Sequence, residues 1–278
     1  MNHTATVIKR NIIIKINTLV VSLLVFSTLA AGVARADEYK LVIQPILPPD
    51  ETRVAFTPLA QYLSNATGHT IKLVTSVNFL AYWETMKKNN EFDLIVDAAH
   101  FTDYRAQRMK YNVLAKIPDV VSYTLVASPD ADILEPKELI GKPVATIGSP
   151  SLGAVRLEEI FPNPIRQPII IEVNNTRDSI EKVLQGKAIG AIVPTPLLGQ
   201  YPDLIPVMTT EQVPHIALSA SPRVPKDIQS KIRKALIDAS KNDTGRKMLE
   251  DINFPSFQST SNKTYKDYAG LLEGVWGY

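Results

Sequence analysis

A short loop, Gly148-Ser-Pro-Ser-Leu-Gly153, holds the residues best suited to chemistry in this chain. It stands between a predicted strand at 143–147 and a predicted helix at 154–161. Backbone N–H groups at the start of a helix have no intrahelical partners, and the helix dipole adds positive potential there. Together with the hydroxyls of Ser149 and Ser151, the loop up to Gly153 would therefore suit an oxyanion. The alternative is that one serine serves only as the helix N-cap.

Three further side chains are candidates for ligand binding. Tyr82, in a predicted helix at 80–89, has a phenol that can donate a hydrogen bond, or it is a half-buried helix aromatic. His100 follows a predicted strand at 92–97, at the carboxyl edge where open α/β sheets bind ligands; the alternative is a loop histidine in water. Thr195 follows a predicted strand at 188–193 and offers a hydroxyl, although Pro-Thr-Pro is also an ordinary rigid turn.

Enzymatic chemistry finds little support in the sequence. The loop at 148–153 has the wrong spacing for a G-x-S-x-G nucleophile elbow, and neither a P-loop nor a Rossmann glycine triplet occurs. The chain has no cysteine, which excludes disulfides, thiol catalysis and cysteine-based zinc sites. Its four histidines are scattered, and no pair has the H-x-x-x-H spacing of a metal site. We therefore expect no catalytic residue, no metal and no cofactor.

Two successive alternations of strands and helices must position the candidate residues. The first half has predicted strands at 39–46, 70–75, 92–97, 113–117 and 120–127 and predicted helices at 50–66, 80–89 and 102–108. The second half has a helical turn at 138–142, strands at 143–147, 169–173, 188–193 and 215–221, and helices at 154–161, 177–185, 226–240, 245–249 and 264–272. This alternation predicts an α/β fold of two lobes, each a mixed sheet flanked by helices, with a ligand cleft between them.

The first 36 residues are typical of a secretory signal peptide. Lys9, Arg10 and Lys15 form a basic start, an apolar run covers 19–31, and Ala34-Arg-Ala36 places small residues around a cleavage site. The alternative is an uncleaved membrane anchor, but the run is short for a bilayer span. We expect cleavage near Ala36 and a periplasmic protein without stable membrane insertion.

Removal of this leader changes the charge balance. Four of the 30 basic residues lie in the leader and no acidic residue does, so the rest of the chain has 26 basic against 28 acidic residues. We therefore expect no concentrated basic face of the kind that binds nucleic acid.

Five stretches in order resemble the phosphate/phosphonate-type periplasmic binding proteins of ABC transporters. They are residues 137–153, 56–63 with Thr67-Gly68, Tyr82 ahead of 92–94, 183–188, and 224–227 through 245–249. The resemblance covers nearly the whole chain after the leader. It implies a type 2 periplasmic-binding fold whose lobes close on a small-molecule ligand, and an ABC-type membrane permease as partner. It also implies that Tyr82 corresponds to a first-lobe tyrosine that the family uses against its ligand.

The resemblance also implies a discontinuous first lobe. The expected organisation is a signal peptide at 1–36, the first part of lobe I at 37–126, lobe II at 127–213 and the second part of lobe I at 214–278.

The sequence departs from the family pattern at two places. Phosphonate binders carry a Ser-Thr-Ser-Gly cluster where this chain has Ser151-Leu152-Gly153, so one apolar side chain replaces a polar one. Ile189 stands where family members often have an aspartate. The leading prediction for the ligand is a phosphate- or phosphonate-class oxyanion. The alternatives are the same fold adapted to a neutral or lipid-like ligand, or a sensing subunit for a membrane kinase.

Overall fold

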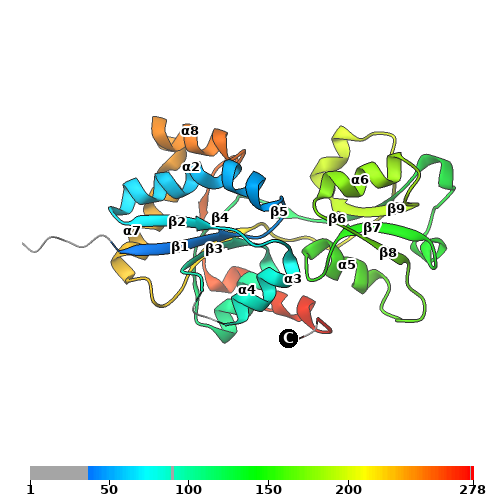
Figure 1. The fold of residues 1–278 in the computed structure, drawn as a ribbon, viewed down its shortest axis with the longest axis horizontal. Helices are drawn as coiled ribbons and strands as arrows, with labels where there is room; N and C mark the ends of the chain where they lie inside the picture. The colour runs from blue at the N-terminus through cyan, green and yellow to red at the C-terminus, as the bar shows by residue number, and fades with distance from the viewer. Residues whose placement is uncertain (1–36, 89–90, 276) are drawn as a thin grey trace, which may run out of the picture. The chain divides into compact units, whose positions relative to one another are not determined.

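The computed structural model describes residues 37–88, 91–275 and 277–278, and the predicted leader lies outside them. Residues Glu38–Tyr278 form one compact unit. Its strands form a six-stranded sheet of order β13-β4-β12-β3-β1-β2, a five-stranded sheet of order β10-β6-β9-β7-β8 and a small pair, β11-β5 (Figure 1).

The six-stranded sheet is mixed. It contains β1 (Glu38–Ile43), β2 (Thr70–Val74), β3 (Leu94–Asp97), β4 (Asn112–Lys116), β12 (Ala217–Ala220) and β13 (Gln258–Ser259). Strands β1, β2 and β3 run parallel, whereas β12 pairs antiparallel with both β3 and β4. Every residue of β3 is buried, as expected for a central strand covered on both faces.

Helices cover both faces of this sheet. On one face, α2 (Pro49–Thr67), α7 (Lys226–Asp238) and α8 (Asp243–Asp251) bury one apolar cluster that includes Phe56, Ile232 and Met248. On the other, α3 (Phe79–Lys87) and α4 (Ala99–Arg108) bury an aromatic cluster that includes Tyr82 and Phe101 (Figure 1). The first turn of α4 and its preceding strand β3 are therefore buried in the protein.

The five-stranded sheet repeats this layering. It contains β6 (Tyr123–Ala127), β7 (Pro143–Ile147), β8 (Ile169–Val173), β9 (Gly190–Pro194) and β10 (Ile205–Thr209). Strand β7 runs parallel to β8 and β9, and β6 runs antiparallel to β9 and β10. Helix α5 (Leu152–Ile160) packs on one face through Leu157, and α6 (Thr176–Leu184) packs on the other through Ile180.

The chain passes between the two sheets along β5 (Val120–Val121) and β11 (Val213–Pro214), which pair antiparallel. We predicted one strand over 120–127, but the structure divides it into β5 and β6, which belong to different sheets. The chain thus joins the five-stranded sheet at Tyr123 rather than after 126. Strand β10 was not predicted, because its sequence Ile-Pro-Val-Met-Thr contains a proline and pairs only at the sheet edge.

Several predicted helices differ from the structure in their bounds or type. Helix α4 begins at Ala99 rather than 102, and α5 begins at Leu152 rather than 154. The predicted helix at 264–272 is two 3-10 segments, Asn262–Tyr265 and Tyr268–Leu272, separated at Asp267, which has a φ of 77°. A left-handed residue cannot continue a right-handed helix. Four other 3-10 segments are Pro129–Ala131, Pro136–Leu139, Thr195–Gln200 and Ala239–Lys241.

Within the described ranges, no helix combines the length and hydropathy needed to cross a bilayer.

Candidate ligand-binding site

The first turns of α4 and α5 lie against each other. Each helix follows the carboxyl end of a central strand, β3 or β7, which is the edge at which open α/β sheets bind ligands. Leu152 and Val155 of α5 share one buried cluster with Ala98 and Ala99 at the start of α4. The predicted cleft edges of the two sheets therefore meet at these two helix ends.

His100 makes the polar contact between the two helix ends. Its side chain is fully buried in the first turn of α4, and Nε2 lies 3.0 Å from the carbonyl oxygen of Pro150. Burial lowers the pKa of His100 to about 4, against smaller effects of the Pro150 carbonyl and Asp97. The ring is therefore neutral at neutral pH. Our alternative prediction of a loop histidine in water was wrong, because α4 begins at Ala99 rather than at 102 and the His100 side chain is buried in its first turn.

A buried ion pair underlies the start of α4. The Asp97 carboxylate, at the end of β3, accepts hydrogen bonds from both terminal nitrogens of Arg105, and the Arg105 Nη2–Asp97 Oδ1 distance is 2.7 Å. Tyr82 donates its hydroxyl to the same carboxylate. Two further hydroxyls complete the network, Thr102 at 2.9 Å from Asp97 Oδ1 and Ser219 at 2.8 Å from Arg105 Nη2. All five residues are buried.

The protonation states of this network follow from its burial. Burial raises the pKa of the Tyr82 phenol far above its usual value, and the neighbouring Asp97 adds to the effect. Burial by itself would lower the pKa of Arg105, but the Asp97 carboxylate more than offsets this and keeps the guanidinium charged. Tyr82 is thus a neutral donor held on Asp97, away from solvent. Its direct role toward a ligand stays a prediction.

The loop serines are engaged by the protein itself. Ser151 caps α5: its hydroxyl accepts from the Ala154 N–H at 3.2 Å and donates to the Ile147 carbonyl at 2.8 Å. Ser151 therefore has the N-cap role that we considered as the alternative to ligand binding. Gly153 packs on its own sheet, where a Cβ would lie 3.3 Å from the Tyr123 ring and 3.4 Å from the Thr146 hydroxyl. Its absent side chain lets α5 approach the sheet.

The Ser149 hydroxyl interacts with Glu158 of α5. Burial raises the pKa of that carboxyl, and the Ser149 hydroxyl opposes this with a smaller effect. Both residues line a cavity of about 160 Å³ beneath α5, together with Glu172 of β8 and the apolar side chains of Leu157 and Phe161. Two carboxyl groups make this cavity unfavourable for an oxyanion.

Thr195 lies where the chain leaves β9. Its hydroxyl accepts a hydrogen bond from Ser122 at 2.9 Å and contacts the Thr124 hydroxyl, also at 2.9 Å. Thr124 contacts Thr209 of β10 at 2.9 Å. These hydrogen bonds link the start of β6 to the ends of β9 and β10. A ligand contact for Thr195 stays a prediction.

The structure thus brings His100 and the 149–153 loop together. Tyr82 lies behind α4, where its hydroxyl bonds to Asp97. The hydroxyls of Ser149, Ser151 and Thr195 contact groups of the five-stranded sheet, its helix α5 and the segments that lead into it. Arg105 and Ser219 were missed by the sequence analysis. The buried helix face that carries Phe101 and Arg105 four residues apart was the available signal for Arg105, whereas no local signal marks Ser219.

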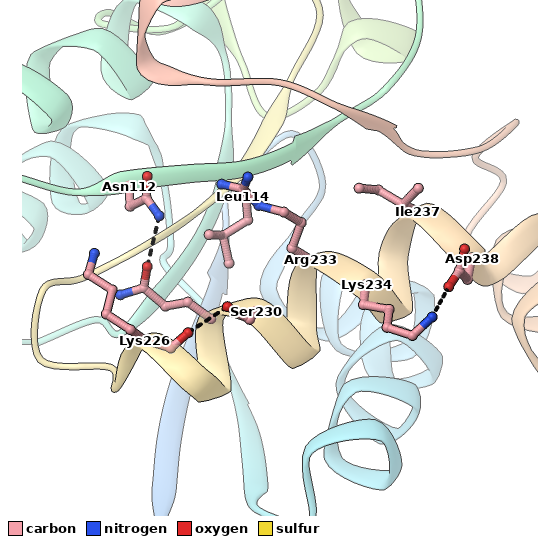
Figure 2. A pocket seen from close by; sticks show the side chains of 9 residues that line it. Asn112, Leu114, Lys226, Ser230, Arg233, Lys234, Ile237 and Asp238 are labelled. Carbon is pink, nitrogen blue, oxygen red and sulfur yellow. Dashed lines mark hydrogen bonds and ion pairs between the residues drawn. The ribbon is translucent and has the colours of Figure 1, made fainter.

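The described residues line three further cavities elsewhere, and neither these nor the cavity beneath α5 combine residues from both large sheets. Figure 2 shows one of about 460 Å³ between α7 and β4. Its cations are partly engaged, because Arg233 donates to the Val113 carbonyl at 3.2 Å and Lys234 pairs with Asp238 at 2.6 Å. This cavity is open, and it lies on α7 rather than at a carboxyl edge. No group of three or more carboxylate and imidazole side chains in the described part of the chain is placed to hold a metal ion.

The family match decides which proteins this fold belongs with. Residues 41–265 match the family described as ABC transporter, phosphonate, periplasmic substrate-binding protein. The chain belongs to this family. Its members are extracytoplasmic substrate-binding components that work with ABC transporter permeases, as the resemblance in the sequence predicted. No curated protein matches the chain in sequence.

Solved structures agree on the fold. The chain is similar to PhnD1 from Prochlorococcus marinus in complex with methylphosphonate, with a TM-score of 0.73, 13% identity, and 86% of this chain and 98% of the other covered. It is also similar to a binding protein component of an ABC phosphonate transporter from Pseudomonas aeruginosa, with a TM-score of 0.71, 12% identity and 85% of each chain covered. A Xanthomonas citri protein bound to ATP has a TM-score of 0.70, 11% identity, and coverage of 86% and 96%. The predicted two-lobed periplasmic-binding fold is confirmed.

Proposed function

We propose that this protein captures a small phosphonate-class oxyanion between the first turns of α4 and α5 and presents it to an ABC-type permease. The observation that carries the proposal is the meeting of two helix N-termini at the carboxyl edges of both sheets, with buried His100 between them. N-terminal N–H groups and helix dipoles stabilise anions. Membership of the phosphonate family and the methylphosphonate in a protein of the same fold support the choice of ligand.

The ligand would enter by separation of the two helix ends. In this structure Leu152 and Ala98 belong to one buried apolar cluster, so these apolar contacts must part to admit a molecule, and the His100–Pro150 hydrogen bond re-forms when the lobes close on it. The antiparallel crossing of β5 and β11 is the natural hinge, because few residues there would absorb the rotation. We accordingly propose lobe II as the part of the chain from β6 through β10, and lobe I as the parts before and after.

In the proposed site, α4 and α5 would contribute differently to ligand binding. Helix α4 has no side-chain cap, so its first N–H groups remain available for an anion. Helix α5 already uses Ser151 as a cap, and its loop supplies the opposite wall. Tyr82 would act through Asp97, which fixes the position of the α4 start. In this role the protein binds and releases its ligand without transforming it.

The leader at 1–36 supports export to the periplasm, with cleavage near Ala36. There the protein would meet its ligand and the external face of the permease.

A ligand panel tests the proposal. Thermal unfolding is measured with methylphosphonate, phosphite and phosphate, and with apolar compounds of similar size. We expect one or more of the oxyanions to raise the unfolding temperature, because a ligand that binds only the folded state stabilises it. His100→Phe should remove the shift. The matched control is Lys226→Ala in the cavity of Figure 2. A shift that survives His100→Phe but disappears in Lys226→Ala, or a response to apolar compounds alone, would overturn the proposal.

A further inference from the structure

The tautomer of His100 is fixed by its partner. A carbonyl oxygen can only accept a hydrogen bond, so the 3.0 Å contact with Pro150 requires a proton on Nε2 of His100. The ring is neutral, and a neutral imidazole with a proton on Nε2 has a lone pair on Nδ1. Nδ1 of His100 is therefore a hydrogen-bond acceptor.

This acceptor is buried and unused. Among the described residues, no donor lies within hydrogen-bond distance of His100 Nδ1, although the side chain is fully enclosed. A buried acceptor left without a donor destabilises the folded state, because it has lost its hydrogen bonds to water and gained none in the protein. The groups whose charge acts on the ring are Asp97 and Arg105 behind α4 and Arg156 on α5, and none of them hydrogen-bonds Nδ1. A donor supplied from outside the chain would remove this cost.

The start of α4 offers hydrogen-bond donors, the N–H groups of its first turn, and one acceptor, Nδ1 of His100. Together they are complementary to one protonation state of the ligand. The uncapped N–H groups of the first turn suit the charged oxygens of an oxyanion. A lone pair repels a charged oxygen but accepts a hydrogen bond from a P–OH group. A phosphonate with one proton, R–PO₂(OH)⁻, offers both kinds of atom, whereas the fully ionised form offers only acceptors.

We propose that His100 Nδ1 selects the singly protonated form of the oxyanion by accepting a hydrogen bond from its P–OH group. The proposal rests on the proposed function and adds to it the protonation state that is bound. Discrimination follows because a ligand without the hydroxyl leaves Nδ1 unsatisfied.

The test compares two ligands of the same shape as the pH changes. Binding of methylphosphonate and of methanesulfonate, which carries no acidic proton, is measured by calorimetry from pH 6 to pH 9. If only the protonated form binds, the Kd of methylphosphonate rises about tenfold per pH unit above the second pKa of the ligand, because the competent fraction falls tenfold. Methanesulfonate should bind at least tenfold more weakly at pH 6.

Two substitutions separate the nitrogens of the ring. His100→Gln can still donate to Pro150 from its amide nitrogen but places no acceptor where Nδ1 stands, so its binding should lose the pH dependence and the preference over methanesulfonate. His100→Asn keeps an oxygen near the position of Nδ1 and should retain both. Long-range ¹⁵N spectra of the purified protein report the tautomer without any ligand, and His100→Gln identifies the signal.

The failures are distinguishable. Methylphosphonate affinity that stays constant from pH 6 to pH 9 in the wild type, or a proton on Nδ1 in the ¹⁵N spectra, overturns the selection by His100 and leaves the proposed function standing. Absence of methylphosphonate binding at every pH overturns this inference. If phosphite and phosphate also fail to bind, the proposed function falls with it.

Discussion

The first turns of α4 and α5 occupy equivalent places in the two sheets but are built differently. Helix α5 is capped by its own Ser151 and enters an apolar cluster through Leu152. Helix α4 has Ala98 at its N-cap position and therefore no side-chain cap, and its first turn is supported from behind by the Asp97–Arg105 ion pair. A serine-rich loop is thus internally satisfied, whereas a plain alanine-histidine turn retains free polar groups. Hydroxyl content alone therefore does not identify which helix end can receive an anion.

The start of α4 is held in place by the residues behind it. The ion pair is fully enclosed, and the Ala98 N–H donates to Gln44 at 3.0 Å, so the end of β3 and the start of α4 are fixed from two sides. A preorganised turn can bind an anion without paying to reorganise its donors. In the 148–151 loop, by contrast, the Ser151 hydroxyl bonds to backbone groups on either side of the loop.

The largest expected effect comes from breaking the support of α4. Arg105→Leu leaves the Asp97 carboxylate buried and unpaired, and breaking a buried pair in this way costs on the order of 3–5 kcal/mol. Urea unfolding should show a midpoint far below that of the wild type. The control is Arg246→Leu, which removes an exposed pair with Asp243. We expect no measurable change there, because exposed pairs contribute little. Equal midpoints for the two variants would show that α4 needs no such support.

The second prediction concerns the pH dependence of folding. The pKa of His100 is about 4 in the folded protein and about 6.5 when unfolded, so the unfolded state binds more protons between these values. This stabilisation is therefore complete above pH 6.5 and is lost as the pH falls toward 4, by about 3 kcal/mol. The difference in unfolding free energy between wild type and His100→Gln, followed from pH 7 to pH 4, isolates this contribution. A difference that stays constant with pH would mean that His100 is solvated.

Much of the fold was predictable from the sequence, and the reason is visible in particular elements. Strand β8 and helix α6 fall within one residue of the predicted bounds, because their apolar periodicity is local. The division of 120–127 into β5 and β6 could not be predicted, because all these residues favour strands and only the sheet topology separates them.

The site was predictable only in part. The positions of His100 and of the 149–153 loop at the carboxyl ends of strands could be predicted, because both follow strands in the sequence. Ser219 reaches Arg105 only because β12 inserts between β3 and β4, a pairing between segments more than 100 residues apart in sequence. The roles of Ser149 and Ser151 depend on hydroxyl directions that residue spacing does not specify.

The third prediction removes the cap that distinguishes α5. Ser151→Ala deletes the hydrogen bond to the Ala154 N–H, and the loss of such a cap costs about 1 kcal/mol. The chemical unfolding midpoint should fall modestly. Because the freed N–H groups would face the proposed ligand site, affinity for methylphosphonate should stay the same or increase. A large loss of affinity with unchanged stability would instead make Ser151 a direct ligand group.

The smallest expected effect comes from giving α4 the cap that it lacks. Ala98 has the extended backbone of an N-cap, with φ −75° and ψ 165°, so Ala98→Ser can place its hydroxyl on the N–H groups of the first turn. Stability should rise by roughly 0.5 kcal/mol, below the usual value for a cap because the added hydroxyl is buried. Methylphosphonate affinity should fall, because the serine competes for the donors that the anion would use. Unfolding curves and calorimetry measure the two changes on one preparation. If Ala98→Ser and Ser151→Ala change affinity in the same direction, the two helix ends are equivalent and the distinction between them is wrong. If affinity falls in the first variant and is kept in the second, the anion is held by the uncapped end of α4.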